Sequence, residues 1–206
     1  MGRKAIFGRR DMAGAALRLV AERGPQAVTV AALAREVGAP TGSIYHRYRS
    51  RAQLLGELWM DVVEGFQAGF VANLAQANDV AGAVESARFM VRWARQHPLE
   101  TRLLLLHRRQ DFVSGTWPED LAKRAAALEP QLGSALRAFG QRAFGRADAE
   151  TMARLRFALL DAPFGGIKPY VQARKALPPA LDDLVAVTAR AVLDPVVGRA
   201  RPRGVR

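Results

Sequence analysis

Residues 29–55 read TVAALAREVGAPTGSIYHRYRSRAQLL, and this stretch predicts the fold around it. Its first part has apolar residues at i, i+3, i+4 and i+7, which make one face of a helix: Val30, Leu33, Ala34 and Val37. Thr29 precedes that face, where a hydroxyl can cap the free N–H groups of a first turn. Gly38 follows it, and glycine tolerates the left-handed conformation that ends many helices. The first part is therefore a short, capped helix.

The second part of the stretch predicts two more helices. One begins at Pro40 or Thr41, because proline suits a first helical turn, and it turns Ile44 and Tyr48 inward, four residues apart. The next begins at Ser50, which opens the capping-box sequence S-R-A-Q. The arrangement is a helix-turn-helix followed by a longer helix, and its second helix is short enough to enter the major groove of DNA.

The run GSIYHRYRSRAQLL at residues 42–55 resembles the DNA-binding domain of the tetracycline-repressor (TetR/AcrR) family, and the resemblance covers residues 8–58. The residues that carry it are Thr29, Leu33, Ala34, Gly38, Gly42, Ile44, Tyr45, His46, Tyr48, Ser50, Arg51, Leu54 and Leu55. The resemblance implies an all-α protein of about nine helices. In that layout a three-helix DNA-binding domain is joined by a long helix to a helical ligand-binding and dimerisation domain, and the last two long helices of each subunit form the dimer.

The remaining sequence has helical periodicity throughout, and no segment predicts a strand. The expected helices cover residues 9–23, 50–74, 79–96, 99–109, 119–144, 148–176 and 180–193. We expect 110–118 to be a connection, Pro130 to bend its helix, Pro163 to interrupt the next one, and Pro195 to end the last, since proline lacks the N–H that a helix interior needs.

Three segments are expected from these patterns. Residues 1–50 form the DNA-binding domain, which begins with a flexible basic arm at 1–8. Residues 51–198 form the effector-binding and dimerisation domain, and residues 199–206 form a basic, disordered tail. The long helix that begins at Ser50 would connect DNA to the second domain, and a rigid helix that tilts at one end moves its other end.

The charge distribution agrees with contact to DNA. The 206 residues carry a net charge of +12, and residues 1–51 alone hold ten Lys and Arg against three Asp and Glu. Residues 199–206 add four Arg and no acid. A basic surplus on the predicted DNA-binding segment is what phosphate contact requires, although the abundance of Arg in the tail is also explained by composition alone.

Composition also excludes several classes of protein. Half of the residues are hydrophobic, so the chain is globular. It has no cysteine, which excludes disulfides and thiolate chemistry. No run of 18 apolar residues and no signal-peptide pattern is present, so we expect a cytoplasmic protein that reaches the nucleoid through DNA and has no membrane partner.

Eight residues are expected to contact DNA: Thr29, Thr41, Gly42, Ser43, Tyr45, His46, Arg47 and Arg51. Arg51, Tyr45 and Thr29 would contact phosphates, which fixes position without reading sequence. Gly42 would let the backbone come close to DNA. Base edges would be approached by Thr41, Ser43, His46 and Arg47, and Arg47 is suited to a bidentate contact with guanine. Tyr45 could instead pack inward, and His46 could touch only phosphate.

A small-molecule effector pocket is expected among the aromatic residues of the second domain. Its candidates are Trp59, Phe66, Phe70, Phe89, Trp93, His107, Phe112 and Trp117, with Phe157 and Arg108 as further members. The candidates for the dimer interface are Leu155, Leu159, Leu181, Leu184 and Val185. Ordinary core packing within one subunit is the alternative for both sets.

These observations predict a homodimeric repressor that binds a palindromic operator and is released by a small molecule. The alternative is a sequence-tolerant architectural DNA-binding protein. An enzyme is disfavoured, because the three histidines are dispersed and no GxxxxGK[ST], HExxH, GxSxG or GxGxxG motif occurs. No cofactor, metal site or catalytic residue is expected.

Overall fold

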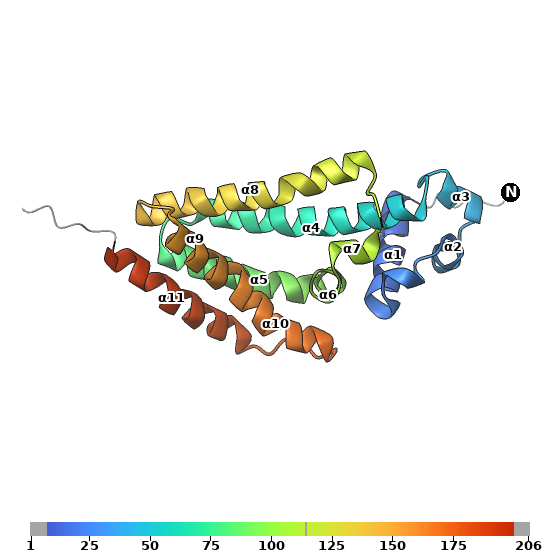
Figure 1. Cartoon of the computed structure of the whole chain (residues 1–206). Coiled ribbons are helices and arrows are strands. Elements are labelled where there is room, and N and C mark those ends of the chain that lie inside the picture. The colour runs from blue at the N-terminus through green and yellow to red at the C-terminus, as the bar shows by residue number, and fades with distance from the viewer. Residues whose placement is uncertain (1–7, 114, 200–206) are drawn as a thin grey trace, which may run out of the picture. The chain divides into compact units, whose positions relative to one another are not determined.

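The protein is helical in the computed structural model, which describes residues 8–113 and 115–199; no strand occurs among them. Figure 1 labels the helices. Their bounds are α1 Arg9–Arg23, α2 Val30–Val37, α3 Thr41–Tyr45, α4 Arg51–Gln76, α5 Val80–Gln96, α6 Pro98–Leu106, α7 Arg109–Phe112, α8 Glu119–Phe144, α9 Ala149–Arg156, α10 Ala162–Gln172 and α11 Leu181–Arg199. The all-α architecture expected from the sequence is confirmed. The predicted arm and tail, at 1–8 and 199–206, lie outside the described residues except at Gly8 and the backbone of Arg199.

The chain forms two compact units. Unit 1 contains the described residues through Val63 together with Leu99–Ala125, and unit 2 contains Glu64–Pro98 with the described residues from Ala126 onward. Both α4 and α8 begin in unit 1 and continue into unit 2. Unit 1 therefore holds the predicted helix-turn-helix and also α7 and most of α6, which the sequence alone did not associate with it.

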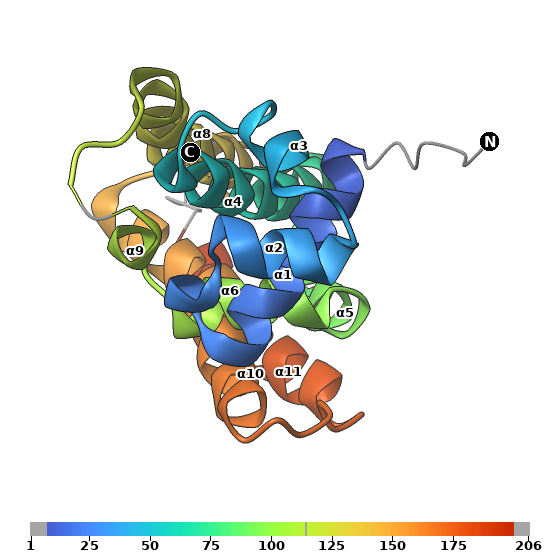
Figure 2. The ribbon, with the colours of Figure 1, turned by 90° about the vertical axis from the view of Figure 1, so that its right-hand side faces the viewer.

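Unit 1 is built around α1, α2 and the start of α4. In the end-on view of Figure 2, α2 lies across α1, and the two helices pack against each other, as do α2 and α3. The fully buried residues of this core include Met12, Ala16, Val20, Leu33, Leu54 and Leu55. Gly56 of α4 permits close packing in the same unit, because a Cβ there would lie 2.7 Å from Cδ1 of Leu121.

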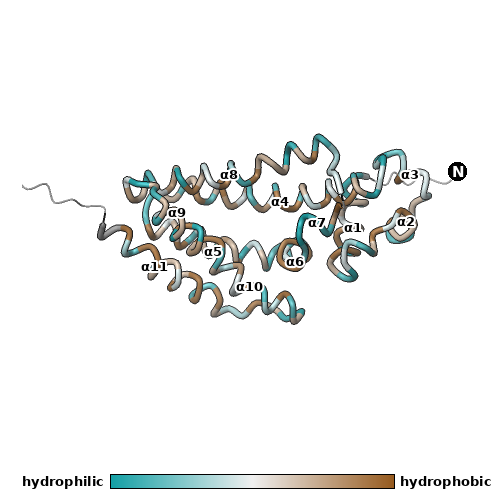
Figure 3. The backbone as a smooth tube through the Cα atoms, viewed as in Figure 1, coloured by the Kyte–Doolittle hydropathy of each residue, from teal (hydrophilic) through white to brown (hydrophobic). Residues whose placement is uncertain are grey.

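Unit 2 has an aromatic centre. Phe66 of α4 packs edge-on against Trp93 of α5 and at a tilt against Phe164 of α10, with ring centroids 5.0 and 5.5 Å apart. Phe70 is fully buried beside Phe66 and Phe89. Truncation of such a buried Phe to Ala costs about 3–5 kcal/mol. Figure 3 shows the alternation of apolar and polar residues along these helices, which turns one face of each helix into this core.

An arginine of unit 2 donates to backbone carbonyls at the end of a helix. Nη2 of Arg142 in α8 lies 3.1 Å from the carbonyl oxygen of Leu74 and 3.2 Å from that of Ala77, at the end of α4. The last carbonyls of a helix lack their regular partner, and here the Leu74 carbonyl also accepts from the N–H of Ala77 at 3.1 Å. The bonds from Arg142 therefore reinforce the end of α4.

Pro195 does not end the last helix, contrary to expectation, and α11 continues through it. Its apolar side still packs on unit 2 beyond the proline, since Val196 is buried. Two arginines also donate to carbonyls on either side of the proline: Nη1 of Arg154 to Val192 at 3.1 Å, and Nη2 of Arg146 to Val196 at 3.3 Å. Tertiary contacts therefore outweigh the lost helical hydrogen bond at this position.

Two other expectations need correction. The segment expected as a connection at 110–118 contains the end of the short helix α7. Pro163 does not break the preceding helix, because the five residues Phe157–Asp161 form a π-helical segment in which the N–H of Ala162 reaches the carbonyl of Phe157. The wider turn accommodates the proline ring, and the helix resumes as α10.

Candidate nucleic-acid interface

The turn between α2 and α3 has the geometry that the sequence predicts. The Oγ1 of Thr29 accepts a hydrogen bond from the N–H of Ala32 at 3.0 Å, which caps α2. Gly38 has φ 72° and ends α2, and the N–H of Ala39 donates to the carbonyl of Ala34 at 2.9 Å. Helix α3 begins at Thr41 with Pro40 before it. Local chemistry thus sets both ends of the turn.

The buried side of α3 and of the residues after it is held by two side chains. Ile44 and Tyr48 are buried, as expected, although α3 ends before Tyr48. Burial raises the pKa of the Tyr48 phenol, and the negative charge of Glu57 raises it further. Glu57 also forms an ion pair of 2.6 Å with Arg9 and accepts a hydrogen bond from Gln53 at 3.0 Å. The buried Ile44 and Tyr48 side chains and the charged network around Glu57 therefore hold α3 and the residues that follow it.

The outward side of α3 presents an uninterrupted set of polar and aromatic groups. Tyr45 is 63% exposed, so it does not pack inward. Ser43 is half-buried, and a Cβ placed on Gly42 would meet nothing within 4 Å. The other members of the set are exposed: Thr41, Gly42, His46 and Arg47. All are free to approach a ligand from solvent, and their contacts with DNA stay predictions.

The start of α4 is capped as predicted, with one difference. The Oγ of Ser50 accepts from the N–H of Gln53 at 3.0 Å, while Oε1 of Gln53 accepts from the N–H of Arg49, not from that of Ser50. The cap therefore reaches one residue further back and includes the loop that follows α3.

Arg51 has partners inside unit 1 that the sequence did not reveal. Its Nε donates to the carbonyl of Val28 at 2.6 Å, and its Nη2 donates to the carbonyl of Pro25 at 2.7 Å. These carbonyls belong to the 3-10 turn Pro25–Ala27 and the residue after it, just before α2. The expected phosphate contact of Arg51 stays a prediction. A phosphate would have to bind a guanidinium that already donates these two hydrogen bonds.

The expected effector residues lie in two separate clusters. Trp59, His107, Phe112 and Trp117 belong to unit 1, where Trp117 meets Trp59 edge-on and lies under the guanidinium of Arg109. The other four belong to the aromatic centre of unit 2: Phe66, Phe70, Phe89 and Trp93. Five of the eight side chains are buried, so most of the set serves as core.

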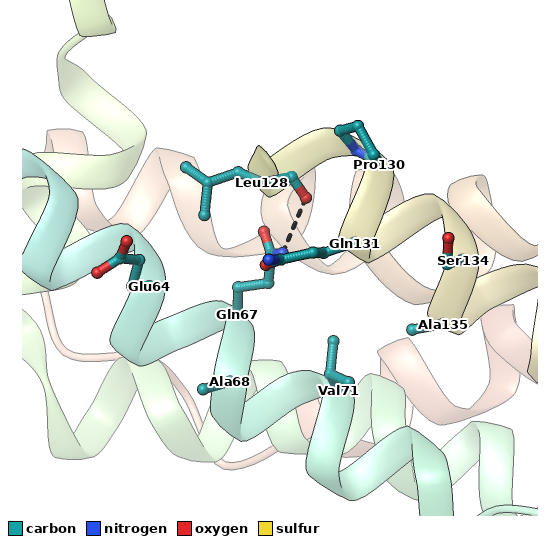
Figure 4. A pocket seen from close by; sticks show the side chains of 9 residues that line it. All are labelled: Glu64, Gln67, Ala68, Val71, Leu128, Pro130, Gln131, Ser134 and Ala135. Carbon is teal, nitrogen blue, oxygen red and sulfur yellow. Dashed lines mark hydrogen bonds between the residues drawn. The ribbon is translucent and has the colours of Figure 1, made fainter. Parts of the chain in front are cut away.

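A groove with room for a small molecule lies within unit 2, between α4 and α8. Its volume is about 700 Å³, in the range of ligand sites. Figure 4 shows Gln67 beneath it, with Nε2 donating to the carbonyl of Leu128 at 2.8 Å. The lining residues are Glu64, Gln67, Ala68, Val71, Leu128, Pro130, Gln131, Ser134 and Ala135. None of them belongs to the expected effector set, because small and amide side chains at separate helical positions carry no motif.

The expected dimer residues also separate into two groups. Leu155, Leu159, Leu181 and Val185 are buried inside unit 2, so they are core residues of one chain. Leu184 is 61% exposed, and two apolar residues outside the expected interface set are exposed as well: Val187 and Phe157. The i, i+3 spacing of Leu184 and Val187 could have identified them as one face of a helix.

Two kinds of feature are absent from the described residues. No three His, Cys, Asp or Glu side chains gather there into a potential metal site. None of the helices in that part of the chain combines the length and apolar character that a membrane crossing needs.

Comparison with known proteins adds a family and a fold. Residues 14–58 match the sequence model of the family described as bacterial regulatory proteins, tetR family. No curated protein matches the chain. Similar solved structures include a transcriptional regulator from Rhodococcus sp. Rha1, with a TM-score of 0.67 at 15% identity over 90% of this chain and 96% of that one.

Two further structures of the same fold are regulators named FadR. The fatty acid degradation regulator FadR from Bacillus halodurans has a TM-score of 0.66 at 16% identity, covering 97% of this chain and 100% of its own. FadR from Bacillus subtilis, in complex with stearoyl-CoA, has a TM-score of 0.61 at 12% identity with the same coverage. The matched segment includes α2, the turn and α3, so residues 14–58 are a DNA-binding domain of the tetR family of bacterial regulatory proteins.

Proposed function

We propose that the protein is a homodimeric repressor that binds a palindromic operator through α3 and leaves it when a small molecule binds. The observation that carries this proposal is the exposed, chemically varied side of α3. It offers hydroxyl, imidazole and guanidinium groups beside a glycine that leaves the backbone accessible. Such groups discriminate base edges, whereas a purely architectural protein needs only charge.

The division of labour on DNA follows from position. Arg47, His46, Thr41 and Ser43 would approach base edges in the major groove. Tyr45 would donate its phenol to a phosphate, and Thr29 would add a contact at the start of α2, where the helix dipole favours an anion. Arg51 differs from these residues, because its guanidinium already donates to two backbone carbonyls inside unit 1.

The proposal of a homodimer is supported by the exposed side of α11. Leu184 and Val187 are both more than half exposed, and the next turn adds exposed Ala191. The opposite side of α11 already packs on α5, α10 and the π-helical segment. A helix that is apolar on both sides needs a second partner, and a second copy of α11 supplies one with the same chemistry.

The groove between α4 and α8 is the effector site that we propose in unit 2. Fatty acyl-CoA is the first ligand class to test, because the Bacillus subtilis FadR structure holds stearoyl-CoA. The groove itself contains Glu64 and no basic side chain, which suits a neutral or cationic ligand better than the phosphates of coenzyme A. Screening should therefore include acyl-CoA, free fatty acids and amphiphilic amines.

Filling the groove tests its role. Ala135→Trp should abolish the thermal stabilisation by any ligand that stabilises the wild type, because the indole occupies the cavity. Ala138→Trp, on the same helix but outside the lining, is the matched control and should keep the response. A ligand that stabilises both variants equally binds elsewhere.

Selection of bound DNA from a random pool, at two salt concentrations, tests the DNA-binding proposal. A two-fold symmetric motif that survives the higher salt is expected from two copies of α3. If no sequence is enriched and binding disappears as salt rises, the contacts are to phosphate alone, and the protein is a sequence-tolerant architectural binder instead.

A further inference from the structure

The segment between α1 and α2 determines where the helix-turn-helix begins. It consists of Gly24, the 3-10 turn Pro25–Ala27 and Val28, which precedes the cap residue Thr29. Pro25 and Val28 are buried. The carbonyl oxygens of both residues accept hydrogen bonds from one side chain of α4, which lies 26 positions after Pro25 and 23 positions after Val28.

That side chain is Arg51, the first residue of α4. Its guanidinium donates from two different nitrogens to two different carbonyls, at 2.6 and 2.7 Å, and a third, longer contact of 3.4 Å reaches Oε1 of Gln26. Hydrogen bonds with a charged donor are about twice as strong as neutral ones. The planar guanidinium spaces its donors rigidly, which a lysine ammonium does not.

We propose that Arg51 is a positioning residue that fixes the start of α2 against the start of α4, and that this brace, rather than a phosphate contact, is its main contribution to DNA binding. Two elements on either side of α3 are joined by one side chain. The brace thereby limits the freedom of α2 and of the α2–α3 turn. The last step, from brace to DNA affinity, depends on the function proposed above.

The two roles of Arg51 make opposite predictions about salt. A phosphate ligand releases a counterion, so its removal flattens the dependence of log affinity on log salt by about 0.9. A brace makes no ion pair with DNA, so its loss lowers affinity and leaves the slope unchanged. Lysine replaces arginine well as a point charge on phosphate but not as a two-carbonyl fork.

The experiment compares Arg51→Ala and Arg51→Lys with the wild type and with Arg49→Ala. Arg49 is exposed and lies two residues away, outside the brace. Its replacement removes one positive charge, as Arg51→Ala does, and leaves the brace intact. Hydrogen exchange of the DNA-free proteins is measured at the amides of Ala32 and Leu33, which bond to Thr29. Operator and random-sequence DNA are then titrated at several salt concentrations, well below the unfolding temperature.

The brace predicts that exchange at Ala32 and Leu33 rises roughly tenfold or more in both Arg51 variants and not in Arg49→Ala. It also predicts that the ratio of operator to random-sequence affinity falls about tenfold, with the salt slope unchanged. Unchanged exchange, a slope flattened by about one ion in Arg51→Ala, and restored affinity in Arg51→Lys would overturn the brace. If Arg51→Ala does not fold, Arg51→Lys decides alone.

Failure of the proposed function gives a different pattern. If the wild type prefers no DNA sequence, the ratio of operator to random-sequence affinity cannot be measured. Hydrogen exchange in the DNA-free proteins still confirms or overturns the brace. Raised exchange with an unchanged affinity ratio would overturn the positioning role and leave Arg51 a residue of stability only.

Discussion

Two regions of the molecule expose large hydrophobic side chains, and the side chains around them differ in chemistry. In unit 1, the described residues expose Tyr45, whose neighbours on α3 and after it are hydroxyl, imidazole and guanidinium groups. In unit 2 they expose Phe157 on the π-helical segment and Leu184 and Val187 on α11. An aromatic ring with a polar tip among hydrogen-bond donors suits nucleic acid, whereas an aliphatic stripe suits another apolar surface.

The difference teaches that exposure alone does not identify a partner. Tyr45 is held outward because Ile44 and Tyr48 occupy the buried side of the same short segment. Leu184 and Val187 lie outward because the opposite side of α11 packs against α5. A substitution in one region should therefore remove only the partner of that region.

The largest effect is expected from Leu184→Glu with Val187→Glu. Two charges on the stripe should convert the dimer into a monomer, as measured by sedimentation. Operator affinity should fall about 100-fold or more, because joining two binding modules raises avidity by roughly 10²–10⁴. Ala72→Glu with Ala75→Glu, at exposed positions of α4, adds the same charge and should remain a dimer. A double variant of α11 that stays dimeric would show that the stripe meets something else.

Arg47→Ala should have the next largest effect, and it should be confined to sequence preference. Loss of a bidentate contact to guanine costs about 1–3 kcal/mol of discrimination at one base pair. Selection of DNA by the variant should therefore show relaxed preference at one position in each half-site, with the dimer intact. An unchanged motif would mean that Arg47 reads no base.

Tyr45→Phe should weaken DNA binding a few-fold, whatever the sequence. The lost phenol hydrogen bond is worth about 1 kcal/mol, and an uncharged group leaves the salt slope unaltered. Because the ring is exposed, the melting temperature of the free protein should not change. Equal affinities of Tyr45→Phe and wild type for all DNAs would remove the phenol from the interface.

The smallest effect concerns acid. Burial lowers the pKa of His107 in unit 1, and the nearby Arg102 lowers it further, while Asp111 opposes the shift. The unfolded chain therefore binds the proton more readily than the folded protein. The free energy of unfolding is not reduced by His107 above about pH 6.5, and it falls as pH drops below that value. Tm should drop slightly more between pH 7.5 and 5 for wild type than for His107→Gln. Parallel curves would contradict this, and dimerisation through α11 should be indifferent to the substitution.

Local features of the fold were readable from the sequence, and features that depend on distant contacts were not. The cap at Thr29, the left-handed Gly38 and the inward Ile44 and Tyr48 follow from neighbours a few positions away, and all are confirmed. The continuation of α11 through Pro195 depends on arginines about 40 and 50 residues earlier, so the usual rule for proline failed there.

The candidate sites show the same limit. Apolar periodicity cannot separate the side of α11 that packs within the chain from the side left exposed, so Leu181 and Val185 were grouped with Leu184. The bonds of Arg51 to Pro25 and Val28 join residues that no sequence pattern links. The groove lies where α4 and α8 present small side chains to each other, which only their packing reveals.

The spacing of operator half-sites tests the central claim most directly. The affinity of the wild type is measured for the selected operator and for versions with 5 or 10 base pairs inserted between the halves. Two copies of α3 held by a dimer should lose most affinity with 5 base pairs, since half a helical turn places the second half-site on the opposite face of the DNA, and should recover part of it with about 10, which restores the face. Equal affinity for all three DNAs would contradict a dimer that reads two half-sites through α3.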